Sequence, residues 1–295
     1  MKKKIFVIHA MSNIHCGTGQ GVEDIDLPTA KEAATGFPIV PGSTVKGVLR
    51  DYYENALGEE KNKLWAAFGP DFENQTGNEY ASALMITDAK ILFMPVRSFN
   101  GVFAYVTSPM ILERLYRDLK QVFPGLNFSI PKVEDNQSMA TQNCKNLVND
   151  HILLEDLELE ATKDEGWDKW AAYLAGLTLP DCDSDDVRDR MILVSDNVFR
   201  FLCDTALPVI ARIKIDQNTG TVQDGALWYE ESLPAETILW GITGAVDAYN
   251  KIICNAEEIL SCFAEEKLTL QFGGNATTGQ GICDLTFIPS ENRHE

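Results

Sequence analysis

Residues 15–50 hold side chains whose types and spacing could act on a phosphodiester. Asp26 lies on a short acidic turn, and Pro28 fixes the backbone just after it. A carboxylate held on a loop can accept a proton from a ribose hydroxyl or bind a divalent cation. His15 could serve as a general acid or base, or bond a phosphate. A solvated turn aspartate and a buried structural histidine are the common alternatives, and the residues themselves leave both open.

A cationic helix is predicted to follow this loop. Apolar residues recur at helical spacing from about residue 43, and Ser43 is a good N-cap. Lys46 and Arg50 are four residues apart, so both cations share one helix face near an N-terminus that favours phosphate. Gly47 leaves room for a second backbone. We expect Ser43, Lys46 and Arg50 to bind RNA; the alternative is an ordinary solvated basic face.

Two glycine-rich loops, residues 17–21 and 273–281, could wrap a phosphate. Glycine adopts positive φ readily, and successive backbone N–H groups can form an anion-binding concavity. The second loop matches neither the dinucleotide fingerprint nor the Walker pattern, and a plain hairpin turn is its alternative. The RNA-binding candidates in these loops are Gly17, Gly19, Gly273, Gly274, Thr277, Thr278 and Gly279.

The overall charge argues against a general nucleic-acid binder. The net charge is −19 and the pI is near 4.6, whereas nucleic-acid binders are usually basic. The charge is uneven, because acidic residues concentrate in 155–189 and 224–236, while 31–50 holds three cations against one carboxylate. RNA could therefore be held locally, in a groove completed by neighbouring subunits or by loop amides.

Cysteine usage and hydropathy indicate a cytoplasmic protein. The seven cysteines are scattered and include no CxxC pair, which predicts reduced thiols and no zinc site. No stretch approaches the ~20 consecutive apolar residues that span a bilayer. The lysine-led start is too short in its apolar run for a signal peptide and is better interpreted as a first strand.

The order of predicted elements indicates an α+β fold with a ferredoxin-like βαββαβ core and long insertions. Strands are predicted at 4–11, 83–96, 101–108, 151–160, 236–245, 268–272 and 282–288, with a hairpin over 209–232. Helices are predicted from residue 43 and over 60–68, 110–123, 166–177 and 245–264. Residues 124–150 are predicted to be irregular.

Several separated blocks of sequence resemble one family. Near the amino end, HCGTG, DLP and GFPIVPGSTVKGVLR resemble the RAMP superfamily of CRISPR proteins. Three later blocks resemble its type III-B effector backbone subunits, the fourth subunit of the Cmr complex: MPVRSFNGVFAYVTSPMILERL, ARIKIDQNTGTVQDGALWYEESLP and LQFGGNATTGQG. The resemblance runs from near residue 5 to about 288 and is weak across 125–190.

The resemblance implies one RAMP domain over 1–295, built as an RNA-recognition-like palm with inserted finger and thumb elements. The expected insertions are 17–41, which carries Asp26, and a thumb-like segment at 180–208. The implied partners are guide (CRISPR) RNA, target single-stranded RNA, copies of the same chain in a filament and other Cmr subunits, with no membrane. The implied activity is an endoribonuclease that cuts guide-paired target RNA at regular intervals.

The resemblance also assigns roles to residues. The family's cleaving aspartate falls on Asp26, which is the candidate metal ligand for a divalent cation, Mg²⁺ or Mn²⁺. His15, Glu230 and Glu231 are supporting catalytic candidates. Lys46 and Arg50 fall on cations that contact guide phosphates. After the proline, the family's glutamine–arginine pair is replaced by Thr29–Ala30–Lys31, and lysine cannot reproduce an arginine fork.

Three other functions stay open at this point. The chain could be a scaffold that binds guide RNA without cutting it. It could be a metal-independent, guide-processing endoribonuclease that uses His15. It could also be a small-molecule enzyme, for which the strongly acidic surface would be ordinary.

Overall fold

The computed structural model describes residues 1–19, 21, 25–57, 61–70, 81–216, 219–248, 255–264 and 267–289. The strands are β1 (Lys2–Ala10), β2 (Ile39–Val40), β3 (Leu84–Ile86), β4 (Ala89–Arg97), β5 (Phe103–Thr107), β6 (Gln137–Ala140), β7 (Leu147–Val148), β8 (His151–Leu154), β9 (Leu157–Lys163), β10 (Met191–Val194), β11 (Val209–Ile215), β12 (Val222–Glu231), β13 (Ile238–Ala245), β14 (Lys267–Gln271) and β15 (Ile282–Ile288). The helices are α1 (Gly42–Leu57), α2 (Lys61–Phe68), α3 (Pro109–Lys120), α4 (Glu165–Thr178), α5 (Ser184–Arg188), α6 (Asp196–Thr205), α7 (Ala256–Phe263) and the 3₁₀ helix η2 (Ala276–Thr278).

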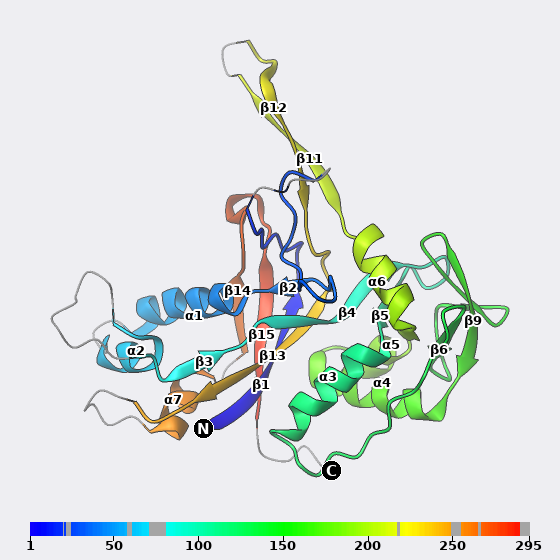
Figure 1. The fold of residues 1–295 in the computed structure, drawn as a ribbon, viewed down its shortest axis with the longest axis horizontal. Helices are drawn as coiled ribbons and strands as arrows, with labels where there is room; N and C mark the ends of the chain where they lie inside the picture. The colour runs from blue at the N-terminus through cyan, green and yellow to red at the C-terminus, as the bar shows by residue number, and fades with distance from the viewer. Residues whose placement is uncertain are drawn as a thin grey trace.

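The palm is an antiparallel sheet with the neighbour order β15-β1-β13-β4 (Figure 1). With α1 between β1 and β4 and α7 after β13, this is the fourth–first–third–second strand order of a βαββαβ unit. The predicted ferredoxin-like core is therefore confirmed. At its centre Phe6 lies opposite Gly241, where a Cβ would come within 2.2 Å of the Phe6 ring, so only glycine fits.

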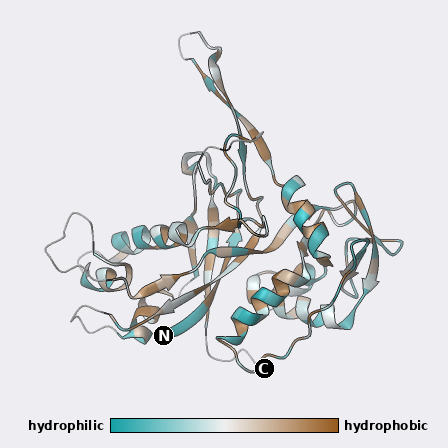
Figure 2. Cartoon of the chain, viewed as in Figure 1, coloured by the Kyte–Doolittle hydropathy of each residue, from teal (hydrophilic) through white to brown (hydrophobic). Residues whose placement is uncertain are grey.

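Everything from β5 to β12 is inserted between the second and third palm strands. The large sheet continues from β4 through β5, β10, β6, β9, β8 and β7. Figure 2 shows both hydrophilic and hydrophobic residues on α3; its buried face includes Ile111, Leu112 and Leu115. The largest fully buried side chains include Trp167 and Trp170 of α4. The insertion therefore has a core that is continuous with the palm.

The segment that projects from the body is the β11–β12 hairpin (Figure 1), which forms a separate two-stranded sheet. Residues 180–208, predicted to be a thumb-like insertion, contain α5, β10 and α6; β10 is fully buried and lies between β5 and β6. A four-residue apolar run such as MILV carries no periodicity that separates a buried strand from part of a helix.

Three local predictions differ from the structure. Helix α1 begins at Gly42, whose N–H donates to Asp88 Oδ1 at 2.7 Å, so Ser43 lies inside the first turn. The predicted helix at 245–264 is described only as α7, because the Asn255–Glu258 capping box begins the helix there. Residues 124–150, predicted to be irregular, contain the short strands β6 and β7.

Candidate nucleic-acid interface

Three segments that are far apart in the sequence meet at His15, just beyond the end of β1. The His15 ring nitrogen Nδ1 lies 2.6 Å from the Glu231 carbonyl oxygen at the end of β12. Because a carbonyl only accepts, Nδ1 carries the proton. The His15 carbonyl accepts from the N–H of Gly274 at 2.9 Å, in the loop between β14 and β15. His15 is buried. Its ring and its carbonyl together join the hairpin base to the second glycine loop.

Two of the predicted glycines are needed to pack around His15. A Cβ on Gly17 would lie 2.8 Å from His15 Nε2. A Cβ on Gly273 would lie 2.2 Å from the His15 carbonyl oxygen, and Gly273 also has a φ of +79°. These contacts give both glycines a packing role, whatever role they have toward RNA.

Some backbone N–H groups of the second glycine loop donate to carbonyls of the same loop. The N–H groups of Thr278 and Gly279 donate within the η2 turn, to Asn275 and Ala276 carbonyls. Thr277 and Thr278 are exposed, as are Gly274 and Gly279. The loop therefore presents an exposed polar surface with fewer available amides than the sequence suggested. Gly19, in the first loop, is also exposed.

Asp26 is exposed and is fixed to the projecting hairpin. Its Oδ2 accepts from the N–H of Tyr229 at 2.7 Å. The N–H of Leu27 donates to the Tyr229 carbonyl at 3.0 Å, and the N–H of Glu231 donates to the Leu27 carbonyl at 3.0 Å. The backbone around Asp26 thus pairs with the base of β12, which places a carboxylate at the surface in a defined position. Glu23 and Asp24, its predicted acidic neighbours, lie outside the described residues.

Glu230 and Glu231 are buried and paired, in contrast to Asp26. Glu231 accepts from the N–H of Thr29 at 3.1 Å and from Lys31 Nζ at 3.0 Å. Glu230 Oε1 accepts from Asn275 Nδ2 at 2.6 Å and lies 3.3 Å from an Arg212 nitrogen. Both carboxylates therefore hold neighbouring loops in place, which is a positioning role.

Lys46 and Arg50 lie on α1. None of the contacts described above between the Asp26 loop and its neighbours involves either cation. Lys46 Nζ donates to Ser82 Oγ at 2.6 Å and to the Leu84 carbonyl at 2.9 Å. Burial and then the nearby charge of Arg50 lower the pKa of Lys46. Among the described residues, both of these partners of the ammonium are neutral oxygens, so they do not cancel its charge.

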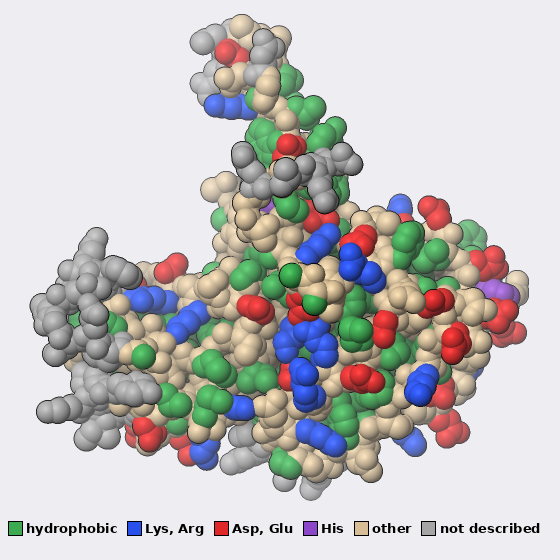
Figure 3. All heavy atoms as spheres, in the orientation of Figure 1, with side chains coloured by type: hydrophobic (Ala, Val, Ile, Leu, Met, Phe, Trp, Pro, Cys, Tyr) green, Lys and Arg blue, Asp and Glu red, His purple; other side chains and the backbone are tan. Residues whose placement is uncertain are grey.

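Charge is distributed unevenly over the surface. On the face drawn in Figure 3, Lys and Arg side chains gather over the middle of the body below the hairpin, and acidic side chains are more frequent toward the right. The net charge of −19 is therefore not spread evenly over the molecule. A local region suited to a polyanion is compatible with an acidic chain.

Comparisons with known proteins identify the family. The sequence profile of the RAMP superfamily matches residues 7–284. The CRISPR system Cmr endoribonuclease Cmr4 of Pyrococcus furiosus is 32% identical over 289 residues, which cover 97% of this chain and 96% of that protein. The chain belongs to the RAMP superfamily and, within it, to the Cmr4 family of CRISPR endoribonucleases.

Solved structures agree with this membership of the Cmr4 family. The crystal structure of oligomeric Cmr4 from Pyrococcus furiosus superposes with a TM-score of 0.73 at 26% identity, covering 99% of this chain and 100% of that one. A chain of the type III-B Cmr-β complex bound to cognate target RNA superposes with a TM-score of 0.74, covering 97% of each chain. Its identity is 20%, so this second likeness shows a shared fold.

No local sequence pattern identifies the residues that brace the Asp26 loop from the side. Arg114 on α3 donates to both carboxylate oxygens of Glu32, at 2.8 Å for the Nη1 contact. Arg200 on α6 donates to the Thr35 carbonyl at 2.7 Å. These pairs are 82 and 165 residues apart, and no local pattern predicts them. In this Cmr4-family member they hold the segment after Asp26 against the inserted helices.

Within the described ranges, no group of three or more His, Cys, Asp or Glu side chains is arranged to hold a metal ion. Mg²⁺ often binds one or two carboxylates and takes its remaining ligands from water and substrate phosphates. The exposed Asp26 carboxylate fits that kind of shared site, in which RNA completes the coordination.

None of the helices in the described ranges is long and apolar enough to cross a membrane.

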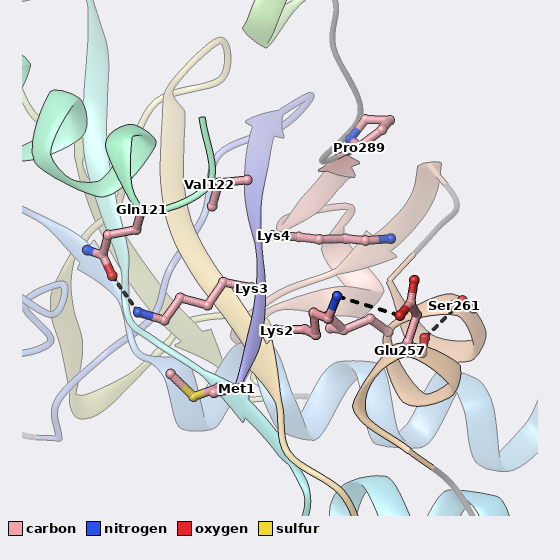
Figure 4. A pocket seen from close by; sticks show the side chains of 10 residues that line it. Met1, Lys2, Lys3, Lys4, Gln121, Val122, Glu257, Ser261 and Pro289 are labelled. Atoms are coloured by element: carbon pink, nitrogen blue, oxygen red, sulfur yellow. Dashed lines mark hydrogen bonds and ion pairs between the residues drawn. The ribbon is translucent and has the colours of Figure 1, made fainter. Parts of the chain in front are cut away.

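A cavity of about 620 Å³ lies at the other end of β1 (Figure 4) and is separate from this interface. Its lining includes Lys2, Lys3 and Lys4, and Lys4 Nζ donates to the Ala264 carbonyl at 3.1 Å. Because β1 rises by about 3.4 Å per residue, its two ends are roughly 27 Å apart. The cavity therefore belongs to the opposite end of the palm from His15.

Proposed function

We propose that this chain is a guide-RNA-binding backbone subunit of a type III-B CRISPR effector, and that it cuts guide-paired target RNA at regular intervals through Asp26. Copies would line up along the guide in the cytoplasm, together with other Cmr subunits. Full-length similarity to a Cmr4 endoribonuclease supports this proposal. The observation that carries the role of Asp26 is its exposed carboxylate, fixed by Tyr229 at the base of the projecting hairpin.

In the proposed reaction the 2′-hydroxyl of the target RNA attacks the adjacent phosphorus. Asp26 takes the hydroxyl proton as the new oxygen–phosphorus bond forms, and the bond from phosphorus to the 5′ oxygen breaks. The leaving oxygen takes a proton from water. Splaying one nucleotide out of the duplex would align the attacking oxygen, and that alignment removes much of the barrier. The products are a cyclic phosphate and a 5′-hydroxyl.

A divalent cation, Mg²⁺ or Mn²⁺, belongs to this proposal. As the alternative to taking the proton itself, Asp26 would hold this ion, which would supply positive charge to the phosphate as negative charge develops there. The chain's own contribution is to fix the carboxylate through the backbone of Tyr229 and Leu27. In this proposal His15 and Glu231 keep the loops in register.

The rest of the proposed RNA path uses the two glycine loops and α1. Lys46 and Arg50 would contact guide phosphates, with Ser43 on the same helix. Gly17, Gly19 and the 273–279 loop would line the path close to the hairpin base. Among the described residues, the Lys46 ammonium donates to neutral oxygens, which supports its part in this path.

The experiment is cleavage of guide-complementary RNA by reconstituted complex, with chemical analysis of the new ends. Regularly spaced cuts that need Mg²⁺ or Mn²⁺ and leave a cyclic phosphate with a 5′-hydroxyl would support the proposal. A 3′-hydroxyl with a 5′-phosphate would mean that water attacks instead. Cuts that persist in EDTA but disappear in His15→Ala would favour the metal-independent rival. Guide binding without any cutting would leave the chain as a scaffold.

A further inference from the structure

Three consecutive lysines at the start of β1 line the cavity of about 620 Å³ at the end of the palm far from His15 (Figure 4). We call this the lysine cavity. It is lined by Met1, Lys2, Lys3, Lys4, Gln121, Val122, Glu257, Leu260, Ser261 and Pro289. No residue of the proposed RNA path or of the Asp26 loop is among them, so the proposed function leaves this cavity without a role.

The cavity forms where β1 extends beyond its neighbour β15. The β1–β15 ladder ends at the pair Ile5↔Ile288, whereas β13 pairs with β1 as far as Lys2. Among the described residues, the β15 side of residues 2–4 therefore has no strand beside it. Gln121, at the end of α3, stands on one side of this gap, and α7 stands on the other. The strand edge and the two helices thus enclose the cavity.

The three lysines reach the cavity from both faces of β1. Successive side chains of a strand point to opposite faces, and Figure 4 shows Lys3 directed toward Gln121 and the other two lysines on the opposite side. Lys3 Nζ donates to Gln121 Oε1 at 2.5 Å, and Lys4 Nζ donates to the Ala264 carbonyl at 3.1 Å. Because a lysine stem is long and flexible, ammonium groups from both faces can contact one anion at the open strand edge.

Lys3 and Lys4 are half-buried cations whose described hydrogen-bond acceptors are both neutral. Half-buried cations elsewhere in this acidic chain pair with carboxylates: Lys31–Glu231, Lys90–Asp118, Arg114–Glu32, Arg188–Asp189, Arg190–Asp186 and Arg212–Glu230. A partly desolvated charge is costly unless an opposite charge compensates it. In the described lining the only carboxylate is Glu257, which lies 3.6 Å from the exposed Lys2. The cavity therefore has an excess of positive charge that suits an anionic ligand.

The remaining lining residues indicate which anion fits. The volume is within the range of about 300–1,000 Å³ that small-molecule sites occupy. Lysines bind phosphate as point charges. Gln121 and Ser261 supply an amide and a hydroxyl, whereas Val122 and Pro289 supply apolar surface. Cations, hydrogen-bonding groups and apolar surface in one cavity match a nucleotide, which combines phosphates, a sugar and a flat base, better than they match a bare inorganic anion.

We propose that the lysine cavity binds a free nucleoside polyphosphate, with Lys3 and Lys4 contacting its phosphates. The base and sugar would lie against the walls formed by Val122, Ser261 and Pro289. This site goes beyond the proposed function, because it lies about 27 Å along β1 from His15. Its test needs neither guide RNA nor cleavage.

The test is calorimetric titration of the full chain with ATP, in EDTA so that no divalent ion bridges ATP to Asp26. The lysine variant is Lys3→Met with Lys4→Met, in which methionine keeps the apolar part of each stem. Lys163→Met is the matched control, because Lys163 Nζ also donates to a carbonyl. Wild type and control should bind one ATP with equal affinity. The lysine variant should bind at least about tenfold more weakly, because it loses two charge-assisted contacts.

A second pair of variants tests the cavity itself while leaving every lysine in place. Ser261 is exposed on α7 and lines the cavity, so the indole of Ser261→Trp should occupy it and weaken ATP binding at least about tenfold. Cys262→Trp is the matched control, because Cys262 is exposed on the same helix and is not part of the lining. It should bind ATP as wild type does. Melting temperatures confirm that each variant is folded.

Parts of the ligand are compared with ATP on the wild-type chain. ATP should bind more tightly than inorganic tripolyphosphate, because the apolar walls contact the base, and adenosine should bind more weakly than either. Tripolyphosphate that binds as tightly as ATP would overturn the assignment to a nucleotide.

Three further results would overturn the site. They are a wild-type Kd for ATP above about 1 mM, an unchanged affinity in the folded lysine variant, and equal affinities of Ser261→Trp and Cys262→Trp. Each of these results leaves the proposed RNA cleavage untouched, since that activity is measured in reconstituted complex with Asp26 variants.

Discussion

The Asp26 carboxylate and the Tyr229 backbone are joined by a hydrogen bond of 2.7 Å, across 203 residues of sequence. This bond ties the loop that carries the carboxylate to the base of the projecting β11–β12 hairpin. Any movement of the hairpin base is therefore transmitted to Asp26. The Asp26 carboxylate is therefore held in a fixed position relative to the base of the hairpin.

Glu231 is predicted to act by positioning this loop. In Glu231→Gln the buried side chain keeps its shape but presents an amide to Lys31 and Thr29 in place of a carboxylate. We expect the free energy of unfolding to fall by about 2–3 kcal/mol, because Lys31 loses its buried partner. Urea unfolding measures this. Glu257→Gln is the matched control, because its ion pair with Lys2 is exposed and should contribute less than about 1 kcal/mol. Equal effects of the two substitutions would contradict the positioning role.

Gly273→Ala and Gly47→Ala should change stability in opposite directions. A Cβ at 273 meets the His15 carbonyl oxygen at 2.2 Å and sits at positive φ, so we expect a loss of at least about 2 kcal/mol. A Cβ at 47 meets nothing within 4 Å, and alanine is a better helix former, so we expect a gain of about 0.5–1 kcal/mol. Thermal unfolding of both variants gives the signs. A neutral Gly273→Ala would mean that the His15 packing is looser than described.

Acid sensitivity should depend on Glu236. A hydrogen bond from His9 at 2.9 Å, with a second from Tyr105 at 2.8 Å, lowers the pKa of Glu236 below its ordinary value of 4.5. A depressed carboxyl pKa contributes stability that is present above about pH 4.5 and is lost as pH falls through the folded-state value. The residue is half-exposed, so the effect is modest. Melting curves between pH 3 and 7 should show a smaller decline for Glu236→Gln than for wild type. Parallel declines would show that the pair contributes nothing to acid stability.

Lys46 should contribute one phosphate contact. We expect Lys46→Met to weaken guide-RNA binding and to reduce the slope of log affinity against log salt by about 0.7–0.9. Lys163→Met on β9 is the matched control, because Lys163 Nζ also donates to a carbonyl, that of Gln142, in the acidic part of the chain. Melting temperatures check that loss of the Ser82 and Leu84 contacts has not unfolded α1. An unchanged salt slope in Lys46→Met would remove Lys46 from the RNA path.

Several parts of the fold could be predicted from the sequence because their elements carry local patterns. Strand β1, the β11–β12 hairpin and the glycine loop before β15 all lie where alternation and turn residues placed them. Strand β10 could not be distinguished in this way, because a buried four-residue run has no polar face. The start of α1 depended on Asp88, which is 46 residues away from the N–H that it binds.

The candidate site could be predicted only in part. The sequence indicated His15, Asp26 and the two glutamates, and it left their arrangement open. What separates the exposed Asp26 from the buried Glu231 is tertiary pairing over about 200 residues, such as the Thr29–Glu231 bond. Nothing in the local sequence around either carboxylate encodes that difference. The structure therefore shows that Asp26 is exposed whereas Glu231 is buried, a difference that the sequence did not predict.

The most direct test of the central claim compares Asp26→Asn, Asp26→Ala and wild type for cleavage of guide-paired target RNA, with binding measured in the same samples. Asparagine keeps an oxygen that can accept from the Tyr229 N–H, so it preserves the loop and removes only the charge. We expect both variants to bind target RNA as wild type does and to cut it at least about 100-fold more slowly. Wild-type cutting by Asp26→Asn would show that the carboxylate is not the cleaving group and would contradict the account.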